Sequence, residues 1–198
     1  MTSVLVLFAH PALEYSRVHR SLIDGLGELP GLTFRDLYQL YPDFYVDVAR
    51  EQELLLQHDF IIWQHPLYWY SVPPLLKQWI DLVFEHGWAY GSTGNYLRGK
   101  RIMNVLSAGG GRATYCAESY NQYTVADFLR PLEQSARLCG MDYLPPYVVH
   151  GTHRLKDDEL PVLRTAYHNF LRAVVEGRVD AETLRAHTYT NDLLTLQS

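Results

Sequence analysis

Three short segments of this sequence combine residue types that bind ligands in proteins. The first covers residues 9–19 and contains His10, Ser16, Arg17, Val18 and His19. Its serine stands at the start of a helical pattern, where free backbone N–H groups, a hydroxyl, a guanidinium and two imidazoles could together bind a phosphate. A simpler interpretation is also open, because a serine in this place is an ordinary N-cap and both histidines could lie at the surface.

The second segment covers residues 64–74 and holds Leu67 followed by three adjacent aromatic residues, Tyr68, Trp69 and Tyr70. Three neighbouring rings cannot all enter one core, so at least one must face solvent, a partner chain or a ligand. Two prolines then restart the chain as a helix, which places flat side chains where α/β sheets bind planar ligands. Core packing of Trp69 is the alternative interpretation.

The third segment is a glycine turn made of Ser107, Ala108, Gly109, Gly110, Gly111 and Arg112. Glycines let the backbone approach a ligand closely, and free N–H groups in such a turn can face negative charge. The same residues could instead form only a flexible turn. The spaced glycines of a dinucleotide fingerprint are absent after the first apolar run, so that mode of phosphate binding is not supported.

These segments must be positioned by the apolar and amphipathic runs around them. Continuous apolar runs predict buried parallel strands at residues 3–8, 59–64 and 102–106, with a weaker edge strand at 32–37 and a last strand near 141–149. Helical patterns lie between them, at about 18–26, 46–56, 73–83 and 125–139, and a further helix begins near Asp157.

Five strands separated by helices predict an α/β fold, a doubly wound five-stranded parallel sheet in the order 2-1-3-4-5. Ligands bind such sheets beyond the carboxyl ends of the strands, and the three segments above follow strands 1, 3 and 4. We therefore expect them at one edge of the sheet, which favours a ligand site over the simpler interpretations. Residues 177–198 look like a short helix and a threonine-rich tail that could reach a neighbouring chain.

Composition limits the classes of function. The chain has 198 residues, 47% apolar and 20% charged, as expected of a single soluble domain. No apolar run approaches the roughly 20 residues that span a bilayer and no basic leader precedes the first strand, so a cytoplasmic location is expected. A net charge of -5 without clustered Lys or Arg argues against nucleic acid, and two cysteines exclude a disulfide framework or a cysteine-rich metal site.

Together the three segments resemble a known family. Ala9-His10-Pro11 with Ser16, the aromatic turn at 64–73 and Gly109-Gly110 are similar in order and spacing to the flavodoxin-like NAD(P)H:quinone oxidoreductases, the DT-diaphorase group. The resemblance covers roughly residues 3 to 175. Within the group, residues 37–44, 51–52 and 75–81 look like the bacterial ancillary subunits of glutathione-regulated potassium-efflux systems.

The resemblance implies a flavodoxin-like flavin-binding domain at residues 1–176 and a C-terminal helical extension or tail at 177–198. It implies FMN as cofactor, with FAD as the alternative, and a homodimer. The activity it implies is two-electron, ping-pong hydride transfer from NAD(P)H through the flavin to a quinone. The identity of the quinone and the choice between NADH and NADPH are left open.

Site residues follow from the same resemblance. The phosphate end of the flavin would lie on His10, Ser16, Arg17, Val18 and His19. The isoalloxazine would lie against Leu67, Tyr68, Trp69 and Tyr70, with Ser107, Ala108, Gly109 and Gly110 near its pyrimidine side. Catalytic roles are implied for Gly109 and Gly110, whose N–H groups would favour negative charge on the ring, and for Tyr115 in the quinone pocket. No metal is implied.

Two residues depart from the family pattern. Asn121 stands where a histidine assists proton transfer, and an amide cannot shuttle a proton at neutral pH, so water or Tyr115 would have to take that part. His19 stands where an asparagine is common, which keeps a donor, alters its reach and makes it pH-sensitive.

Two functions of different classes remain. The favoured one is an NAD(P)H dehydrogenase acting on quinones. The alternative is a regulatory ancillary subunit of a membrane potassium-efflux transporter, with the flavin as a structural or sensing group and peripheral association at the inner face of the cell membrane. Four aromatic residues follow the second predicted strand: Tyr38, Tyr41, Phe44 and Tyr45. They could pack within their own loop, or they could form a docking or dimer surface. An electron-transfer flavodoxin is a less favoured third interpretation.

Overall fold

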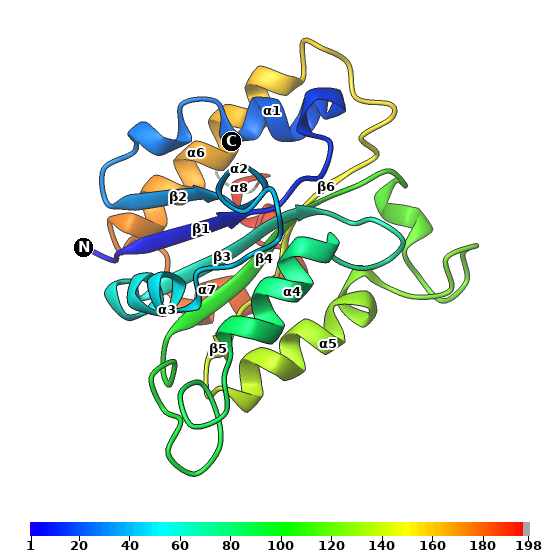
Figure 1. The fold of residues 1–198 in the computed structure, drawn as a ribbon. Helices are drawn as coiled ribbons and strands as arrows, with labels where there is room; N and C mark the ends of the chain where they lie inside the picture. Colours follow the sequence, from blue (N-terminus) through cyan, green and yellow to red (C-terminus); the bar gives the residue numbers. More distant parts are fainter. Residues whose placement is uncertain (196–198) are drawn as a thin grey trace.

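The computed structural model describes residues 1–195 and consists of one sheet covered by helices on both faces (Figure 1). The strands are β1 Val4–Phe8, β2 Leu32–Asp36, β3 Phe60–Pro66, β4 Arg101–Ala108, β5 Asp142–Tyr143 and β6 Tyr147–His150. The α-helices are α1 Arg17–Ile23, α2 Leu37–Leu40, α3 Val48–Gln57, α4 Pro74–Val83, α5 Val125–Leu138, α6 Leu160–Val175, α7 Ala181–Arg185 and α8 Asp192–Thr195. Short 3-10 helices are η1 Leu13–Tyr15, η2 Leu26–Glu28 and η3 Arg112–Thr114.

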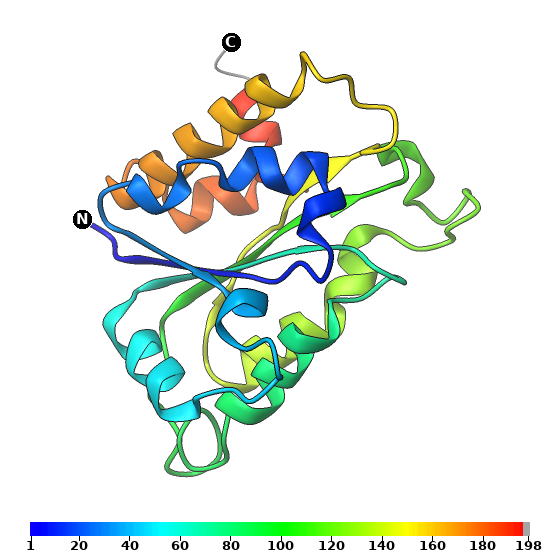
Figure 2. The same cartoon turned by 45° about the horizontal axis from the view of Figure 1, so that its top comes forward.

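The sheet has the predicted order, β2-β1-β3-β4-β5, and all its pairings are parallel. Its central strand β1 is buried at every position because side chains alternate between two apolar cores. Leu5 and Leu7 enter the core beneath α3, α4 and α5, whereas Val4 and Val6 enter the core beneath α1 and α6. Figure 2 shows these helices as separate layers on the two sides of the sheet.

The fifth position of the sheet differs from the single strand expected at 141–149. Two short strands, β5 and β6, pair with β4 in succession, and Leu144-Pro145-Pro146 separates them. Three residues lie between Tyr143 and Tyr147, whereas two lie between their β4 partners Ile102 and Val105, so the chain has one extra residue here, which is a bulge. Prolines donate no backbone hydrogen bond, so the ladder breaks where they stand.

Helix boundaries follow local capping more closely than apolar pattern. The segment expected as one helix at 18–26 ends at Ile23 and continues as η2 after Gly25, whose φ of 74° breaks the helix. The helix expected near Asp157 begins at Leu160, because Glu159 accepts the Lys156 N–H in a turn before it. Thr124 and Asp127 form a reciprocal capping box that starts α5 at its predicted place.

As far as Thr195, the C-terminal extension folds back onto its own chain. Helices α7 and α8 lie beside α6 on the same face of the sheet (Figure 2). Leu184, Tyr189 and Thr190 are buried, and the Thr190 N–H donates to the Pro146 carbonyl at 2.9 Å. None of the helices in the described part of the chain is long and apolar enough to cross a membrane.

Candidate functional site

A cleft of about 750 Å³ opens beyond the carboxyl ends of the strands, at the edge of the sheet expected from the sequence. Four loops form it. The loop after β1 and the start of α1 provide His10, Tyr15, Ser16, Arg17 and Val18, and the turn after β3 provides Pro66, Leu67, Tyr68, Trp69 and Tyr70. The end of β4 and the loop after it provide Ser107, Gly109, Gly110, Thr114, Tyr115 and Tyr120, and the loop after β6 provides Thr152, His153 and Arg154.

The first wall is the N-terminus of α1. Ser16 caps this helix, since its hydroxyl accepts the His19 N–H at 3.2 Å. The wall presents the first-turn N–H groups of Arg17 and Val18, which have no partner within a helix. The Arg17 guanidinium bends toward the loop before α6, where it pairs with Asp157. At the start of α1, an anion would therefore be bound by backbone N–H groups more than by the Arg17 guanidinium.

His10 stands at the base of the same wall and joins it to the aromatic turn. Its Nδ1 accepts the Ala12 N–H at 3.2 Å, and its ring meets the Tyr68 ring edge-on at 5.7 Å between centroids. Burial lowers the pKa of His10, although Glu14 opposes this. Because Nδ1 accepts, the neutral ring carries its proton on Nε2.

His19 is fully buried behind the wall. Its ring is not among the side chains that line the cleft. Burial holds the pKa of His19 well below its usual value, and His10 and His65 lower it further, so the ring stays neutral where a titrating group was expected. Its Nε2 lies 2.9 Å from the Ser107 hydroxyl and thereby joins α1 to β4.

The aromatic turn is a two-residue reversal in which Tyr68 and Ser71 exchange backbone hydrogen bonds at 3.1 and 3.0 Å. Trp69 and Tyr70 occupy the centre with φ of 48° and 63°, a conformation that glycine and asparagine adopt more readily. Trp69 is 94% exposed, which excludes core packing. The Tyr70 ring packs against the Phe128 ring in a tilted arrangement, with 4.8 Å between the centroids.

The glycine turn forms the floor opposite. A Cβ added at Gly109 would lie 2.6 Å from Nε2 of His153, and one at Gly110 would lie 2.6 Å from the Thr114 hydroxyl and 3.1 Å from the Tyr115 ring. A larger residue at either position would have to displace these side chains, so packing as well as flexibility favours glycine in the turn. Ala108 is buried, and its side chain does not line the cleft.

Tyr115 and Asn121 lie on the loop that follows this turn but face different surroundings. Tyr115 lines the cleft, and burial raises the pKa of its hydroxyl, which stays protonated as a hydrogen-bond donor. Asn121 is buried outside the cleft and donates to the Thr114 carbonyl at 2.8 Å. The asparagine braces the turn that carries Tyr115.

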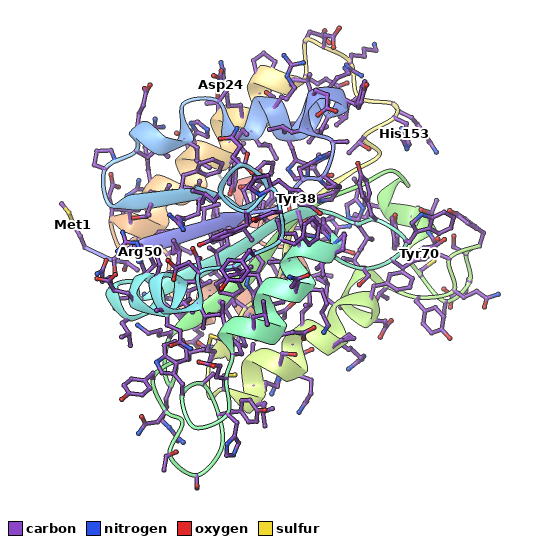
Figure 3. All side chains as sticks on the ribbon, in the orientation of Figure 1. Met1, Asp24, Tyr38, Arg50, Tyr70 and His153 are labelled. Carbon is purple, nitrogen blue, oxygen red and sulfur yellow. The ribbon has the colours of Figure 1, made fainter. Side chains whose placement is uncertain are left out.

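Sequence reasoning missed the fourth loop, which contributes Thr152, His153 and Arg154. This loop is attached to the glycine turn, because Gly151 N–H donates to the Gly110 carbonyl at 2.8 Å. Figure 3 shows His153 and Tyr70 at the same end of the molecule, on different loops. The rule that selected the other loops applies here too, since this loop follows the carboxyl end of a strand.

The aromatic residues after β2 mostly pack against the core. Tyr41 is buried and its hydroxyl donates to Glu51 at 2.7 Å, while Tyr38 and Phe44 meet edge-on at 5.9 Å between centroids. Tyr45 alone of this group is largely exposed, at 83%. Within residues 1–195, no cluster of three or more His, Cys, Asp or Glu side chains could hold a metal ion.

Comparison with known proteins adds to this geometry. A sequence family described as having a flavodoxin-like fold matches residues 2–171. The glutathione-regulated potassium-efflux system ancillary protein KefF of Klebsiella aerogenes is 44% identical over 168 residues, which are 85% of this chain and 94% of that protein.

Two solved structures are similar along nearly their whole length. General stress protein 14 of Treponema denticola, solved in complex with FMN, has a TM-score of 0.82 and 39% identity, and the match covers 87% of this chain and 99% of that one. A protein from P. pentosaceus named NADPH-quinone reductase has a TM-score of 0.76 and 34% identity, and the match covers 85% and 96% of the two chains.

Proposed function

This chain belongs to the flavodoxin-like fold family, and from that premise we propose that it is a flavin-dependent NAD(P)H:quinone oxidoreductase that uses FMN. The observation that carries the proposal is the convergence of a helix N-terminus, an aromatic turn and a glycine turn on one cleft. The similar structures support it, since one was solved with FMN and the other is named as an NADPH-quinone reductase.

The cleft suits FMN in size, donors and clearance. Cofactor sites typically enclose roughly 300–1,000 Å³, and this cleft measures about 750 Å³. The first-turn N–H groups of α1 suit a phosphate. The bare backbone at Gly109 and Gly110, where a Cβ would collide with neighbours, suits a flat ring held close to the chain.

In this proposal Ser16, Arg17, Val18 and His10 bind the phosphate end, and His19 acts from behind by holding the Ser107 hydroxyl. The turn from Leu67 to Tyr70 and the residues Ser107, Gly109 and Gly110 hold the ring between them. When bound, the flavin would accept a hydride from NAD(P)H and pass it to the quinone. Residues 1–176 form the flavin-binding part, and residues 177–198 the extension.

The protein would contribute orientation, exclusion of water and charge stabilisation. Backbone N–H groups of the glycine turn favour negative charge on the ring beside them. The protonated Tyr115 hydroxyl donates a hydrogen bond to a quinone oxygen, and a solvent proton completes the hydroquinone. Because Asn121 is hydrogen-bonded to the loop outside the cleft, it takes no part in this proton transfer.

The test begins with the bound flavin. Purified protein should be yellow and should release FMN, not FAD, on denaturation, as mass spectrometry would identify. In stopped-flow experiments, NADPH should bleach the flavin absorbance and menadione should restore it. A colourless protein that takes up no added FMN contradicts the proposal, and slow reduction by NADPH would favour an electron-transfer flavodoxin.

A second function is favoured by the 44% identity to a potassium-efflux ancillary protein. In this alternative the chain, as a homodimer in the cytoplasm, docks at the inner face of the membrane on an efflux transporter. The exposed Tyr45 is a candidate contact. Potassium efflux from vesicles that contain the transporter should rise when the flavin-loaded chain is added. Unchanged efflux and no co-purification with the transporter would contradict this function.

A further inference from the structure

The C-terminal segment lies against the back of the loop that carries Tyr115. Arg112, in η3, forms a bidentate ion pair with Asp192 at the start of α8, with distances of 2.5 Å for Nη1–Oδ1 and 2.8 Å for Nη2–Oδ2. The guanidinium carbon of Arg112 also lies 4.6 Å from the centroid of the Tyr189 ring. A fork-shaped pair combined with a cation–π contact holds a side chain in one geometry.

A row of rings connects the same segment to Tyr115. His150, the last residue of β6, lies between Tyr115 and Tyr189, with ring centroids 5.6 and 5.1 Å away. Both tyrosines are buried. Burial and the nearby Arg112 lower the pKa of His150 to about 4, so its ring is neutral near pH 7 and packs as an uncharged aromatic group.

The segment is itself anchored to the sheet by contacts that do not involve Arg112. Thr190 N–H donates to the Pro146 carbonyl, and the Asn191 side chain bonds both backbone groups of Val148, accepting its N–H at 3.0 Å and donating to its carbonyl at 3.2 Å. Residues 189–192 therefore present Tyr189 and Asp192 to the Tyr115 loop from a fixed support.

We infer that residues 189–192, which lie beyond the family match, position Tyr115 at the cleft through Arg112 and His150. Arg112, His150, Tyr189 and Asp192 are positioning residues, because none of them lines the cleft. The inference rests on the proposed function, which assigns the quinone contact to Tyr115. Quinone binding should depend on this support, whereas the flavin phosphate, bound at α1 on another wall, should not.

The chain offers a matched control, because Arg185 in α7 pairs with Asp142 in β5. This ion pair also ties the extension to the sheet, but neither residue lines the cleft. The full-length protein would carry Arg112→Ala, Asp192→Ala, the exchange Arg112→Asp with Asp192→Arg, or Arg185→Ala. Three quantities are measured: FMN affinity by fluorescence, KM and kcat for menadione, and hydrogen exchange in residues 110–118.

Arg112→Ala and Asp192→Ala should each raise the menadione KM by about tenfold and speed hydrogen exchange in residues 110–118. FMN affinity should stay within about twofold of wild type, a difference below 0.5 kcal/mol. The charge-swapped double variant should bring KM most of the way back to the wild-type value. Arg185→Ala should change neither KM nor hydrogen exchange in residues 110–118.

Two results would overturn the inference while leaving the proposed function intact. One is an unchanged KM and unchanged exchange in both alanine variants of a wild type that binds FMN and reduces menadione. The other is an equal rise in KM for Arg185→Ala, which would assign the effect to general loosening of the extension. If the wild type itself neither binds FMN nor reduces menadione, the proposed function fails, and the hydrogen-exchange result still decides whether Arg112 and Asp192 hold the loop.

Discussion

At the scale of single residues, the shape of the cleft depends on glycines, which have no Cβ, as well as on the side chains that line it. Gly110 has the Thr114 hydroxyl and the Tyr115 ring where its Cβ would stand, whereas Gly111, the next residue, has nothing within 4 Å. Neither residue has a positive φ, so backbone strain does not distinguish them. Gly110 and Gly111 therefore differ in one respect: there is room for a Cβ at Gly111 and none at Gly110 unless a neighbour moves.

We therefore predict that the methyl group of Gly110→Ala shifts the backbone of the glycine turn itself and weakens FMN binding by about tenfold, equivalent to about 1.4 kcal/mol. Gly111→Ala should bind FMN as the wild type does. Fluorescence titration of the flavin-free proteins measures both affinities. Equal affinity in the two variants would show that the glycine turn does not need bare backbone at Gly110.

At the scale of elements, the turn after β3 keeps two bulky residues in a conformation that glycine adopts more easily. Each non-glycine residue held there costs on the order of 1–3 kcal/mol, and such strain clusters at functional sites. Trp69 and Tyr70 stand side by side in this conformation at the edge of the cleft. Their side chains are retained against the preference of the backbone, which agrees with a role in shaping the quinone pocket.

Replacement of the pair by Asn-Gly, as Trp69→Asn with Tyr70→Gly, should relieve this strain. The free energy of unfolding should rise by about 1 kcal/mol, while menadione turnover falls and flavin content is retained. Urea denaturation and steady-state kinetics measure the two effects, and Tyr45→Ala, an exposed ring outside the cleft, is the control. Loss of flavin, with normal menadione turnover by the flavin that remains bound, would instead assign the turn to cofactor packing.

A second element, α3, is held by a buried carboxylate. Glu51 is fully buried, pairs with Arg35, and accepts the Trp79 indole N–H from α4 at 2.9 Å. Its removal would leave the Arg35 charge without its partner, so Glu51→Ala should lower the free energy of unfolding by about 3–5 kcal/mol. On the same helix, Glu53→Ala breaks an exposed ion pair with Arg50 and should change the free energy of unfolding by less than about 1 kcal/mol. Similar urea midpoints for the two variants would contradict this role.

At the scale of the whole molecule, several histidines are buried or partly buried in neutral form. The pKa values of His10, His19 and His65 are lowered mainly by burial, and that of His150 is lowered to about 4. In the unfolded chain these groups titrate near 6.5, so below that pH the unfolded state binds more protons than the folded state. Their contribution to stability is present above pH 6.5 and is lost as the pH falls through the folded values.

We therefore predict that the free energy of unfolding falls between pH 7 and pH 5. His19→Gln, which keeps a polar group beside Ser107 without a titrating ring, should fall less steeply over this window. Urea unfolding at the two pH values measures the slopes, and a parallel slope for His19→Gln would contradict the prediction.

Local patterns in the sequence determined most of the strands and helices and the edge of the sheet that holds the cleft. Continuous apolar runs specify β1, β3 and β4 because a strand buried on both faces needs apolar residues at every position. Serine, proline and threonine caps mark where α1, α4 and α5 begin. Loops after successive parallel strands must then meet at one edge.

Only the tertiary structure decided which side chains line that edge and which support it from behind. His19 and Ser107 are 88 residues apart, and Arg112 and Asp192 are 80 apart. The burial of His19, the fourth wall after β6 and the return of residues 189–192 to the sheet depend on how distant elements pack. Periodicity and capping describe interactions over a few residues, so contacts at these separations leave no mark in the local pattern.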